Sequence, residues 1–141
     1  MSDSVTMRLL GPADAKLLDR VAPGVFDNPV DARLAAEFLA DPRHHLVVAV
    51  IDGLVVGMAT GVHYIHPDKP RELWVNEVGV APAHQRHGIG KRLLQALFAH
   101  GRALGCAEAW LGTEETNTAA RRLYAVSGGE EQRMVYVTFN L

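Results

Sequence analysis

The sequence contains one cysteine, Cys106, among its 141 residues. A single cysteine excludes a disulfide framework within the chain and argues against a zinc cluster. Cys106 lies at the start of an expected strand without an obvious histidine partner, so we interpret it as inert core and not as an acyl-carrying nucleophile. The seven histidines show no metal-ligand spacing. We expect them to be solvated or loop residues, with no bound metal.

A strong charge imbalance and long apolar runs are also missing. The formal net charge is −2 and no basic run exceeds two residues, which argues against nucleic acid as a partner. No segment is long and apolar enough to cross a bilayer, and the opening MSDSVTMRLL lacks the basic-then-apolar order of a signal peptide. We therefore expect a cytoplasmic protein without a membrane partner. Its 48% hydrophobic composition predicts one globular domain over residues 1–141.

The hydrophobic pattern predicts an alternation of strands and helices. Apolar, β-branched runs indicate strands, and apolar residues at helical spacing indicate helices; an Asn28-Pro29 cap and an Asp52-Gly53 hairpin turn punctuate them. The expected strands cover residues 6–10, 46–51, 54–64, 73–80, 107–111 and 134–139, and the expected helices residues 13–22, 30–40, 89–104 and 117–126. This βααβββαβαβ order predicts an α/β (α+β) fold with a mixed, mostly antiparallel sheet and helices on both faces.

The stretch between the expected central strand and the longest helix carries the strongest motif, Gln85-Arg86-His87-Gly88-Ile89-Gly90. Glycines allow a tight turn and close ligand approach, and the free N–H groups that open a helix attract an anion such as a pyrophosphate. Arg86, Lys91 and Arg92 add positive charge. A Walker loop is excluded because G-K-[ST] is missing, and a Rossmann fingerprint fits poorly because its third glycine is absent.

This Q-x-x-G-x-G form, after a VxVxP strand end and before K-R-L-L, resembles the acetyl-CoA loop of the GNAT superfamily of N-acetyltransferases. The order of elements also resembles the GNAT fold over nearly the whole chain. The resemblance implies that acetyl-CoA is the cosubstrate and that the loop holds its pyrophosphate. It further implies that the main chain of the central strand holds the pantetheine arm. The implied cofactor-binding residues are Val78, Gly79, Val80, Gln85, Arg86, His87, Gly88, Ile89, Gly90 and Lys91.

Glu77 lies within the apolar central strand, and alternation predicts that it shares a side with Leu73 and Val75. A buried carboxylate has a raised pKa, which suits a general base that takes a proton from an ammonium group. Many GNAT enzymes carry an acidic residue here. The alternatives are a structural carboxylate paired with an arginine, such as Arg71 or Arg133, and Glu72 as the base.

Asn117 and Tyr124 are separated by about two helical turns, or about 10 Å, and so share one helix face. Their N-x-x-A-x-x-x-Y spacing resembles the GNAT segment that lies along the pantetheine arm. The resemblance implies that the Asn117 side chain bonds this arm and that the Tyr124 hydroxyl protonates the departing CoA thiolate. The alternative is a tyrosine that only packs on the sheet with its hydroxyl at the surface.

Acidic residues gather where a GNAT substrate site would lie, and opposed acids attract a cationic amine. The candidate substrate-binding residues are Asp27, Asp31, Glu72, Glu114 and Glu115. A merely solvated acidic face is the alternative. The segment HYIHPDKPRELWVNEVGV and the short C-terminal part resemble the type I aminoglycoside 3-N-acetyltransferases, which implies transfer to the 3-amino group of an aminoglycoside and a role in antibiotic resistance. Asn117 stands where that family has an acid.

Two other functions remain open, acetylation of a polyamine or peptide N-terminus, and a non-catalytic CoA-binding sensor. GNAT domains commonly end with two strands after the last helix, whereas thirteen residues follow Gly128 here. These residues have room for one strand, so we expect an exposed sheet edge or one covered in a homodimer.

Overall fold

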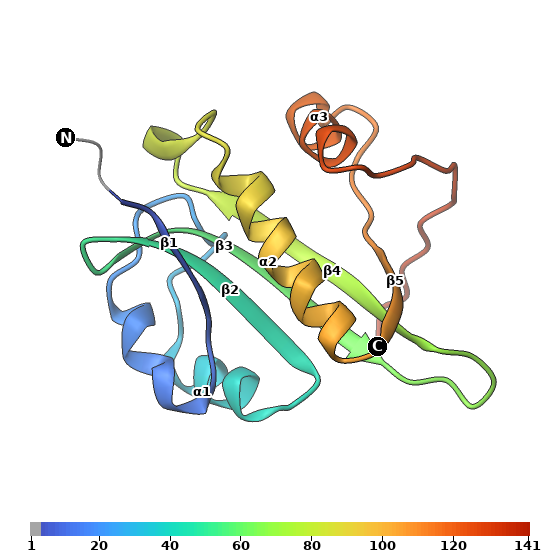
Figure 1. The fold of residues 1–141 in the computed structure, drawn as a ribbon, viewed down its shortest axis with the longest axis horizontal. Helices are drawn as coiled ribbons and strands as arrows, with labels where there is room; N and C mark the ends of the chain where they lie inside the picture. The colour runs from blue at the N-terminus through green and yellow to red at the C-terminus, as the bar shows by residue number, and fades with distance from the viewer. Residues whose placement is uncertain (1–3) are drawn as a thin grey trace.

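The computed structural model describes residues 4–141, which form a single mixed sheet with helices packed on both faces (Figure 1). The sheet order is β1-β2-β3-β4-β5, and the predicted fold class is confirmed. The strands are β1 (Thr6–Leu9), β2 (His44–Ile51), β3 (Leu54–Tyr64), β4 (Arg71–Val80) and β5 (Cys106–Trp110). The helices are α1 (Ala32–Ala40), α2 (Ile89–Ala103) and α3 (Thr118–Val126), with 3-10 turns η1 (Pro12–Asp19) and η2 (Pro82–His84).

The pairing of the strands follows the lengths of their connections. β1 to β4 pair antiparallel, and β5 pairs parallel to β4 after the α2 crossover. Asp52 and Gly53 both have positive φ, of 48° and 76°, as the tight turn between β2 and β3 requires. The hairpin that this dipeptide predicts is confirmed.

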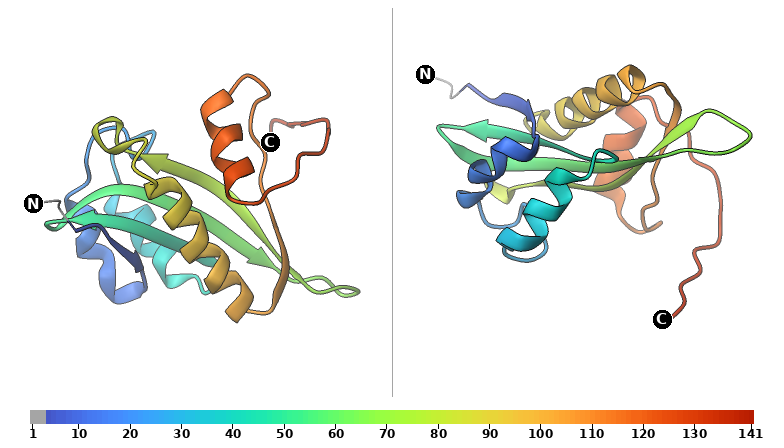
Figure 2. Two further views of the ribbon diagram at one scale, coloured as in Figure 1. Left: turned by 45° about the horizontal axis from the view of Figure 1, so that its top comes forward. Right: turned by 90° about the horizontal axis from the view of Figure 1, so that it is seen from below.

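The two faces of the sheet are covered by different helices (Figure 2). On one face α2 buries its apolar stripe, and Leu93 and Leu97 have no exposed surface. The predicted amphipathic helix and its orientation are therefore confirmed. The opposite face carries η1 and α1, which cover β2 and β3. Most of the core is aliphatic and comes from β2, β3 and α2.

A bulge in β4 changes which face its side chains occupy. Thr60 of β3 pairs with Glu77, but the next residue, Gly61, pairs with Val75, so Asn76 has no partner on β3. Leu73 and Val75 are buried, with Leu73 against α2. Glu77 instead shares the α1 face with Thr60 and is exposed. The prediction that Glu77 is buried on the side of Leu73 and Val75 is therefore wrong, because strict alternation fails at a bulge.

The first two expected helices begin or end elsewhere. The expected helix over residues 13–22 is a 3-10 turn that ends at Asp19, since Val21 and Ala22 leave it to bond β3 at Val55. The second helix is capped by Asp31 and not by Asn28-Pro29. The Asp31 carboxylate accepts the backbone N–H groups of Arg33 and Leu34 at 2.9 and 3.0 Å.

The expected closing strand over residues 134–139 is also wrong. These residues follow α3 as an extended segment that joins no strand of the described chain and runs away from the sheet (Figure 2). Alternation of side chains predicts the extended conformation, but a strand also needs a partner edge.

Candidate active site

The phosphate loop has the predicted geometry at the start of α2. Gly88 caps the helix with φ of +77°, and Arg86 also has a positive φ, of 65°. The Gln85 side chain donates a hydrogen bond to the Val80 carbonyl at 3.0 Å, which ties the loop to the end of β4. No side chain of the described residues caps α2. Its first N–H groups, from Ile89 onward, are therefore available to an anion.

The residues of this loop divide into two roles. Arg86, His87 and Lys91 are exposed and can provide positive charge. Ile89 is buried in the core and can offer only its backbone. A Cβ on Gly90 would lie 3.0 Å from Cδ2 of Leu123, so the glycine allows α3 to approach α2. Gly90 thus also serves helix packing, and its role beside a ligand stays a prediction.

Arg92 does not belong to the loop. Its guanidinium donates to the Val5 carbonyl at 3.1 Å, on the β1 side of α2. The positive charge that this residue was expected to add near the phosphate is therefore directed elsewhere.

Beyond Trp74 the parallel strands β4 and β5 separate. β5 pairs with Arg71–Trp74, whereas Glu77–Val80 pair with β3 alone among the described residues. The free edge of β4 can therefore accept an extended ligand arm as an added strand. A cavity of about 400 Å³, the β4-edge cavity, opens here. It is lined by Gly24, Val25, Asp27, Met58, Asn76, Glu77, Val78, Gly79, Val80, Gln85, Gly112, Thr113 and Tyr124.

Gly79 lets the segment before α1 cross β4 closely. A Cβ on Gly79 would overlap the carbonyl oxygen of Val25. Gly24 has φ of +84°, and a Cβ there would lie 2.8 Å from the Pro82 ring. The two glycines thus bring the chain before α1 over the β4-edge cavity, and Asp27 contributes to its wall.

A second cavity, of about 260 Å³, lies on the α1 face of the sheet. We call it the α1 cavity. Asp27 and Glu77 line both cavities, so the Glu77 carboxylate stands on their shared wall. The α1 cavity is lined by Leu18, Phe26, Asp27, Asn28, Pro29, Val30, Asp31, Leu34, Ala35, Phe38, Leu46, Thr60 and Glu77.

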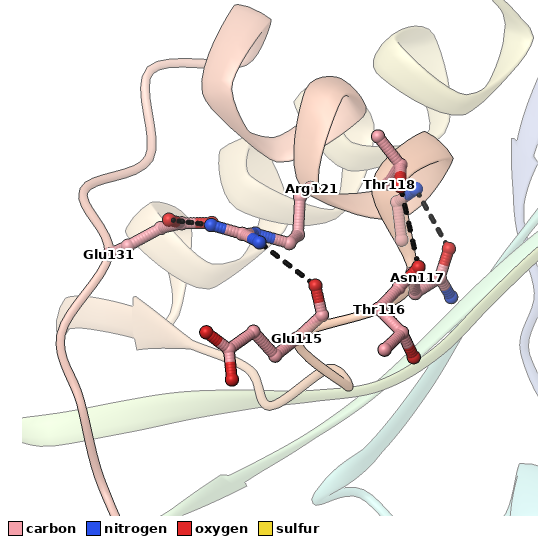
Figure 3. A network of polar contacts seen from close by, with 7 residues as sticks. Glu115, Thr116, Asn117, Thr118, Arg121 and Glu131 are labelled. Carbon is pink, nitrogen blue, oxygen red and sulfur yellow. Dashed lines mark hydrogen bonds and ion pairs between the residues drawn. The ribbon is translucent and has the colours of Figure 1, made fainter.

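Tyr124 reaches the β4-edge cavity from α3. Burial raises the pKa of its hydroxyl, so the group stays protonated at neutral pH and can donate a proton. Asn117 begins the same helix, where its side-chain oxygen accepts the Ala120 N–H at 3.1 Å (Figure 3). The predicted ligand-binding asparagine is therefore a helix cap, and it lines neither cavity; its amide N–H₂ remains a donor.

The predicted substrate-binding acids separate into two groups. Asp27 and Asp31 line the α1 cavity, although Asp31 is engaged as the α1 cap. Glu72 lies outside both cavities, where His66 Nε2 is 2.7 Å from its carboxylate and the Tyr64 hydroxyl donates to it at 3.4 Å.

Glu114 and Glu115 also lie outside both cavities. The Glu115 carbonyl accepts a hydrogen bond from the Arg121 guanidinium at 2.9 Å (Figure 3). The structure thus places Glu77 and Asp27 at both cavities, Tyr124 at the β4-edge cavity and Asp31 at the α1 cavity, and it leaves the other three acids outside both.

Several cavity residues were missed by sequence reasoning. Asn76 precedes Glu77, and Gly112-Thr113 follow β5 at the point where the strands separate. The glycine after an expected strand is a usable signal for such a turn. Phe26 and Phe38 line the α1 cavity, but isolated aromatics in a sequence predict core as readily as a pocket.

Three histidines form a buried cluster that the sequence did not predict. His45 Nε2 lies 2.7 Å from His63 Nδ1, and His45 Nδ1 lies 3.0 Å from His100 Nε2. Burial, with the nearby His100 and His63, lowers the pKa of His45 to about 4. Burial also lowers the pKa values of His63 and His100. The expectation that the histidines are solvated is wrong for His45 and His63, which lie under α2.

The chain belongs to the acetyltransferase (GNAT) family, whose sequence pattern matches residues 15–128. It is 34% identical over 131 residues to the N-alpha-acetyltransferase RimI of Mycobacterium tuberculosis, across 90% of this chain and 79% of that protein. The protein is therefore an acetyltransferase, and use of acetyl-CoA is expected of its family.

Solved structures share the fold at low sequence identity. An aminoglycoside acetyltransferase from an uncultured soil metagenomic sample, in complex with sisomicin, has a TM-score of 0.86 at 18% identity, over 97% of this chain and 96% of that one. The aminoglycoside N-acetyltransferase AAC(6′)-Iy in complex with CoA has a TM-score of 0.80 at 20% identity, over 99% and 97%. By its name the latter is a 6′ enzyme, so the resemblance to the 3-N type is not confirmed.

Within residues 4–141 no group of three or more His, Cys, Asp or Glu side chains is placed to hold a metal ion. Of the helices described, none is long and apolar enough to span a membrane.

Proposed function

We propose that the protein is an acetyl-CoA-dependent N-acetyltransferase that moves acetyl to a primary amine of a small cationic substrate. The observation that carries the proposal is the Glu77 carboxylate on the wall shared by the two cavities. The β4-edge cavity has the features that acetyl-CoA needs, namely an open strand edge and an adjacent helix N-terminus. The α1 cavity then receives the acceptor amine.

The reaction proceeds by direct transfer in a ternary complex. Acetyl-CoA supplies the acetyl thioester. Glu77 accepts a proton from the acceptor's ammonium group, and the free nitrogen attacks the thioester carbonyl carbon. A carbon–nitrogen bond forms, the carbon–sulfur bond breaks, and Tyr124 gives its hydroxyl proton to the departing sulfur. The new amide nitrogen releases its second proton, which restores the Tyr124 hydroxyl through solvent. The raised pKa of Tyr124 keeps that proton in place until the thiolate forms.

Cys106 is a poor candidate for an acetyl-carrying intermediate. It lies at the start of β5 and lines neither cavity. Burial raises the pKa of its thiol, against a smaller opposing effect of Arg71, so little thiolate forms at neutral pH. This supports transfer without a covalent enzyme intermediate.

The acceptor that we favour is an aminoglycoside, modified at its 3-amino group. Asp27 and Glu77 give the α1 cavity a negative wall that attracts a polycationic sugar. The sequence resemblance of residues 63–80 supports the 3-amino position. Because a solved structure with this fold is a 6′ enzyme, the acetylated position must be determined by experiment.

A peptide N-terminus is the second candidate. The relation to RimI at 34% identity favours it, as do the apolar side chains of Phe26, Leu34 and Phe38 beside the acids. An α-amino group would then meet Glu77, while the first side chain of the peptide would contact this apolar wall.

A thiol-release assay with acetyl-CoA separates these acceptors. The panel contains gentamicin-type and kanamycin-type aminoglycosides, spermidine and short peptides with different first residues. We expect rapid CoA release with aminoglycosides, and NMR of the product then identifies the acetylated nitrogen. Release with peptides alone would replace the acceptor but keep the chemistry. Tight acetyl-CoA binding without release for any amine would overturn the enzymatic proposal in favour of a sensor.

Tyr124→Phe tests the proposed acid. We expect kcat to fall by about 10² or more with little change in acetyl-CoA affinity, since only proton donation is lost. Tyr136→Phe, which removes a hydroxyl outside both cavities, is the matched control and should retain wild-type turnover. Unaltered turnover in Tyr124→Phe would remove Tyr124 from the acid role.

Glu77→Gln tests the proposed base. It should lower kcat/KM by about 10², because the carboxylate that accepts the proton is removed while the shape of the side chain is kept. Glu72→Gln tests the alternative base. We expect a smaller loss than in Glu77→Gln, because Glu72 lies outside both cavities. A larger loss in Glu72→Gln than in Glu77→Gln would exchange the two assignments.

A further inference from the structure

A cluster of aromatic and charged side chains lies outside both cavities, where β3, β4 and β5 run side by side. We call it the aromatic platform, and its members are Tyr64, His66, Glu72, Trp74 and Trp110. The indole rings of Trp74 and Trp110 stack with their centroids 5.5 Å apart and an interplanar angle of 15°. Trp110 thus packs against one side of Trp74, yet 37% of Trp74 remains exposed. The fold therefore presents an indole to solvent on an ordered support.

Hydrogen bonds hold the platform in place. The Trp110 indole N–H donates to the Tyr64 hydroxyl at 2.6 Å, and that hydroxyl donates to Glu72 Oε1 at 3.4 Å. His66 Nε2 lies 2.7 Å from the other carboxylate oxygen, Oε2. Because the 3.4 Å contact is long, Oε1 of Glu72 can accept a further and stronger donor. A fixed indole beside such a carboxylate suits a cationic ligand.

The platform continues the face of the sheet that carries Glu77. Along β4 this face presents Glu72, then Trp74, then Glu77, and their partners on β3 are Tyr64, Val62 and Thr60. These β3 partners are two residues apart from one to the next, so they share one face. At about 3.4 Å per residue, Trp74 lies about 7 Å along the sheet from each acid, and the two acids are about 14 Å apart. An indole thus stands midway between two carboxylates.

This order of groups defines the chemistry of a ligand. An acceptor amine at Glu77 is the reacting end, and a second ammonium group can bind the Glu72 carboxylate. Between them, a saturated ring can pack its C–H groups on Trp74, and an ammonium group on that ring is attracted by the indole. A linear polyamine has the charges without the ring, and a short peptide has its one ammonium at the end. An elongated polycation built of several saturated rings matches all three groups.

We propose that the aromatic platform is a second subsite for the acceptor. Trp74 holds a ring of a multi-ring aminoglycoside, and Glu72 binds an ammonium group remote from the acetylated one. This subsite rests on the proposed function, because the acceptor amine at Glu77 fixes the other end of the ligand. Trp74 and Glu72 then determine specificity without touching the acetyl group. The single aminated ring 2-deoxystreptamine is too short to reach the platform from Glu77, so the platform selects for length.

Tryptophan fluorescence tests binding at the platform without turnover. The chain has two tryptophans, Trp74 and Trp110, so its intrinsic emission reports on this surface alone. With CoA present in place of acetyl-CoA, a kanamycin-type aminoglycoside should change the emission in a saturable way. 2-Deoxystreptamine should leave the emission unchanged. A flat titration with the aminoglycoside would overturn the proposal, and this measurement needs no variant to fold.

Substitutions test the same contact through kinetics. Trp74→Ala should raise KM for the aminoglycoside about tenfold and leave kcat within about twofold, since the ring contact lies away from the reacting atoms. Trp74→Phe keeps an aromatic ring and should recover most of the affinity. Glu72→Gln should raise KM about threefold, as expected for an exposed charge pair. Leu9→Ala, an exposed apolar side chain on β1 at the opposite edge of the sheet, is the matched control and should keep the wild-type KM.

The outcomes distinguish failure of the subsite from failure of the proposed function. CoA release with an aminoglycoside, but an unchanged KM in Trp74→Ala, would overturn the subsite and keep the N-acetyltransferase. An equal rise in KM for 2-deoxystreptamine would also overturn it, because Trp74 would then affect the whole site. A saturable change of emission without CoA release would support the subsite and overturn acetyl transfer to this acceptor.

Discussion

The part of the chain up to Gly101 and the part after it are packed in opposite ways. Among the described residues, the twenty apolar residues of the buried core all lie between Leu10 and Leu97, in and beside the strands β2 to β4, in α1 and α2, and around η1. From Arg102 to Leu141 no residue is buried. The second part nevertheless carries Tyr124, the candidate acid. The chain thus consists of a well-packed scaffold and a less buried part that carries the functional helix α3. The stability of the scaffold therefore says little about the position of α3.

The second part is joined to the first where β5 pairs with β4 at Arg71–Trp74, and α3 meets the first part at few places. Leu123 of α3 contacts the α2 backbone at Gly90, and Tyr124 reaches the end of β4 through the β4-edge cavity. Substitutions in the first part should therefore change the free energy of unfolding. Substitutions at the junction should change the kinetics instead.

Leucine-to-alanine replacement on each side should give the largest contrast. Leu97 has no exposed surface, so Leu97→Ala leaves a cavity and should cost about 2–5 kcal/mol of unfolding free energy. Leu123 is only partly buried, and Leu123→Ala should cost about 1 kcal/mol or less. Urea denaturation of both variants measures the difference. Similar losses would mean that α3 belongs to the same cooperative unit as the core.

The histidine cluster makes the first part sensitive to acid. Unfolded His45 has the ordinary pKa of 6.5, and folded His45 one of about 4, so the unfolded state binds more protons between these values. Stability is therefore complete above about pH 6.5 and is lost as the pH falls toward 4. The contribution of His45 to this loss is at most about 3 kcal/mol.

Denaturation curves between pH 4 and 7 measure that loss. His45→Phe should flatten the pH dependence, because the titrating group is gone. His87→Gln, in the exposed phosphate loop, should leave it unchanged. A wild-type free energy of unfolding that stays constant from pH 7 to pH 4 would contradict the role of the cluster.

Gly90→Ala probes the junction itself and should have the smallest effect on stability. The new Cβ would lie 3.0 Å from Cδ2 of Leu123, so the Leu123 side chain must move by a few tenths of an ångström, and α3 can shift with it. We expect a loss of about tenfold in kcat/KM, since small misplacements of catalytic groups are costly, with little change in Tm. Gln95→Ala, on the exposed face of α2, is the control. A large fall in Tm would show that the junction supports the core.

The sequence predicts most of the first part because its signals are local. Asp52-Gly53 has the backbone preferences of a tight hairpin, and the apolar stripe of α2 has the period of a helix on a sheet. The end of the first helix is different. Val21 leaves the helical path to bridge Val55, a contact across more than thirty residues that no local pattern contains.

The candidate site is predictable where a motif fixes the backbone. Gly88 begins α2, as the motif predicts, and Gln85 and Tyr124 line the β4-edge cavity. Asn117 and Glu72 differ, because a nearby backbone N–H and a histidine engage their side chains. Which partner a polar side chain finds depends on the assembled fold. The roles of these residues in binding and catalysis stay predictions.

Asn76, the residue of β4 that has no partner on β3, determines which face of the sheet the following residues occupy. In a regular strand, the surroundings of a side chain depend on whether its position is odd or even. Because Asn76 is an extra residue in β4, every residue after it lies on the face opposite to the one that its sequence position predicts. Deletion of this one residue would make Val75 and Glu77 consecutive residues of a regular strand, so Glu77 would still lie on the face opposite Val75, toward both cavities. The activity should therefore survive the loss of Asn76, whereas pairing of Asn76 with β3 in a regular strand would turn the Glu77 carboxylate under α2, among leucines.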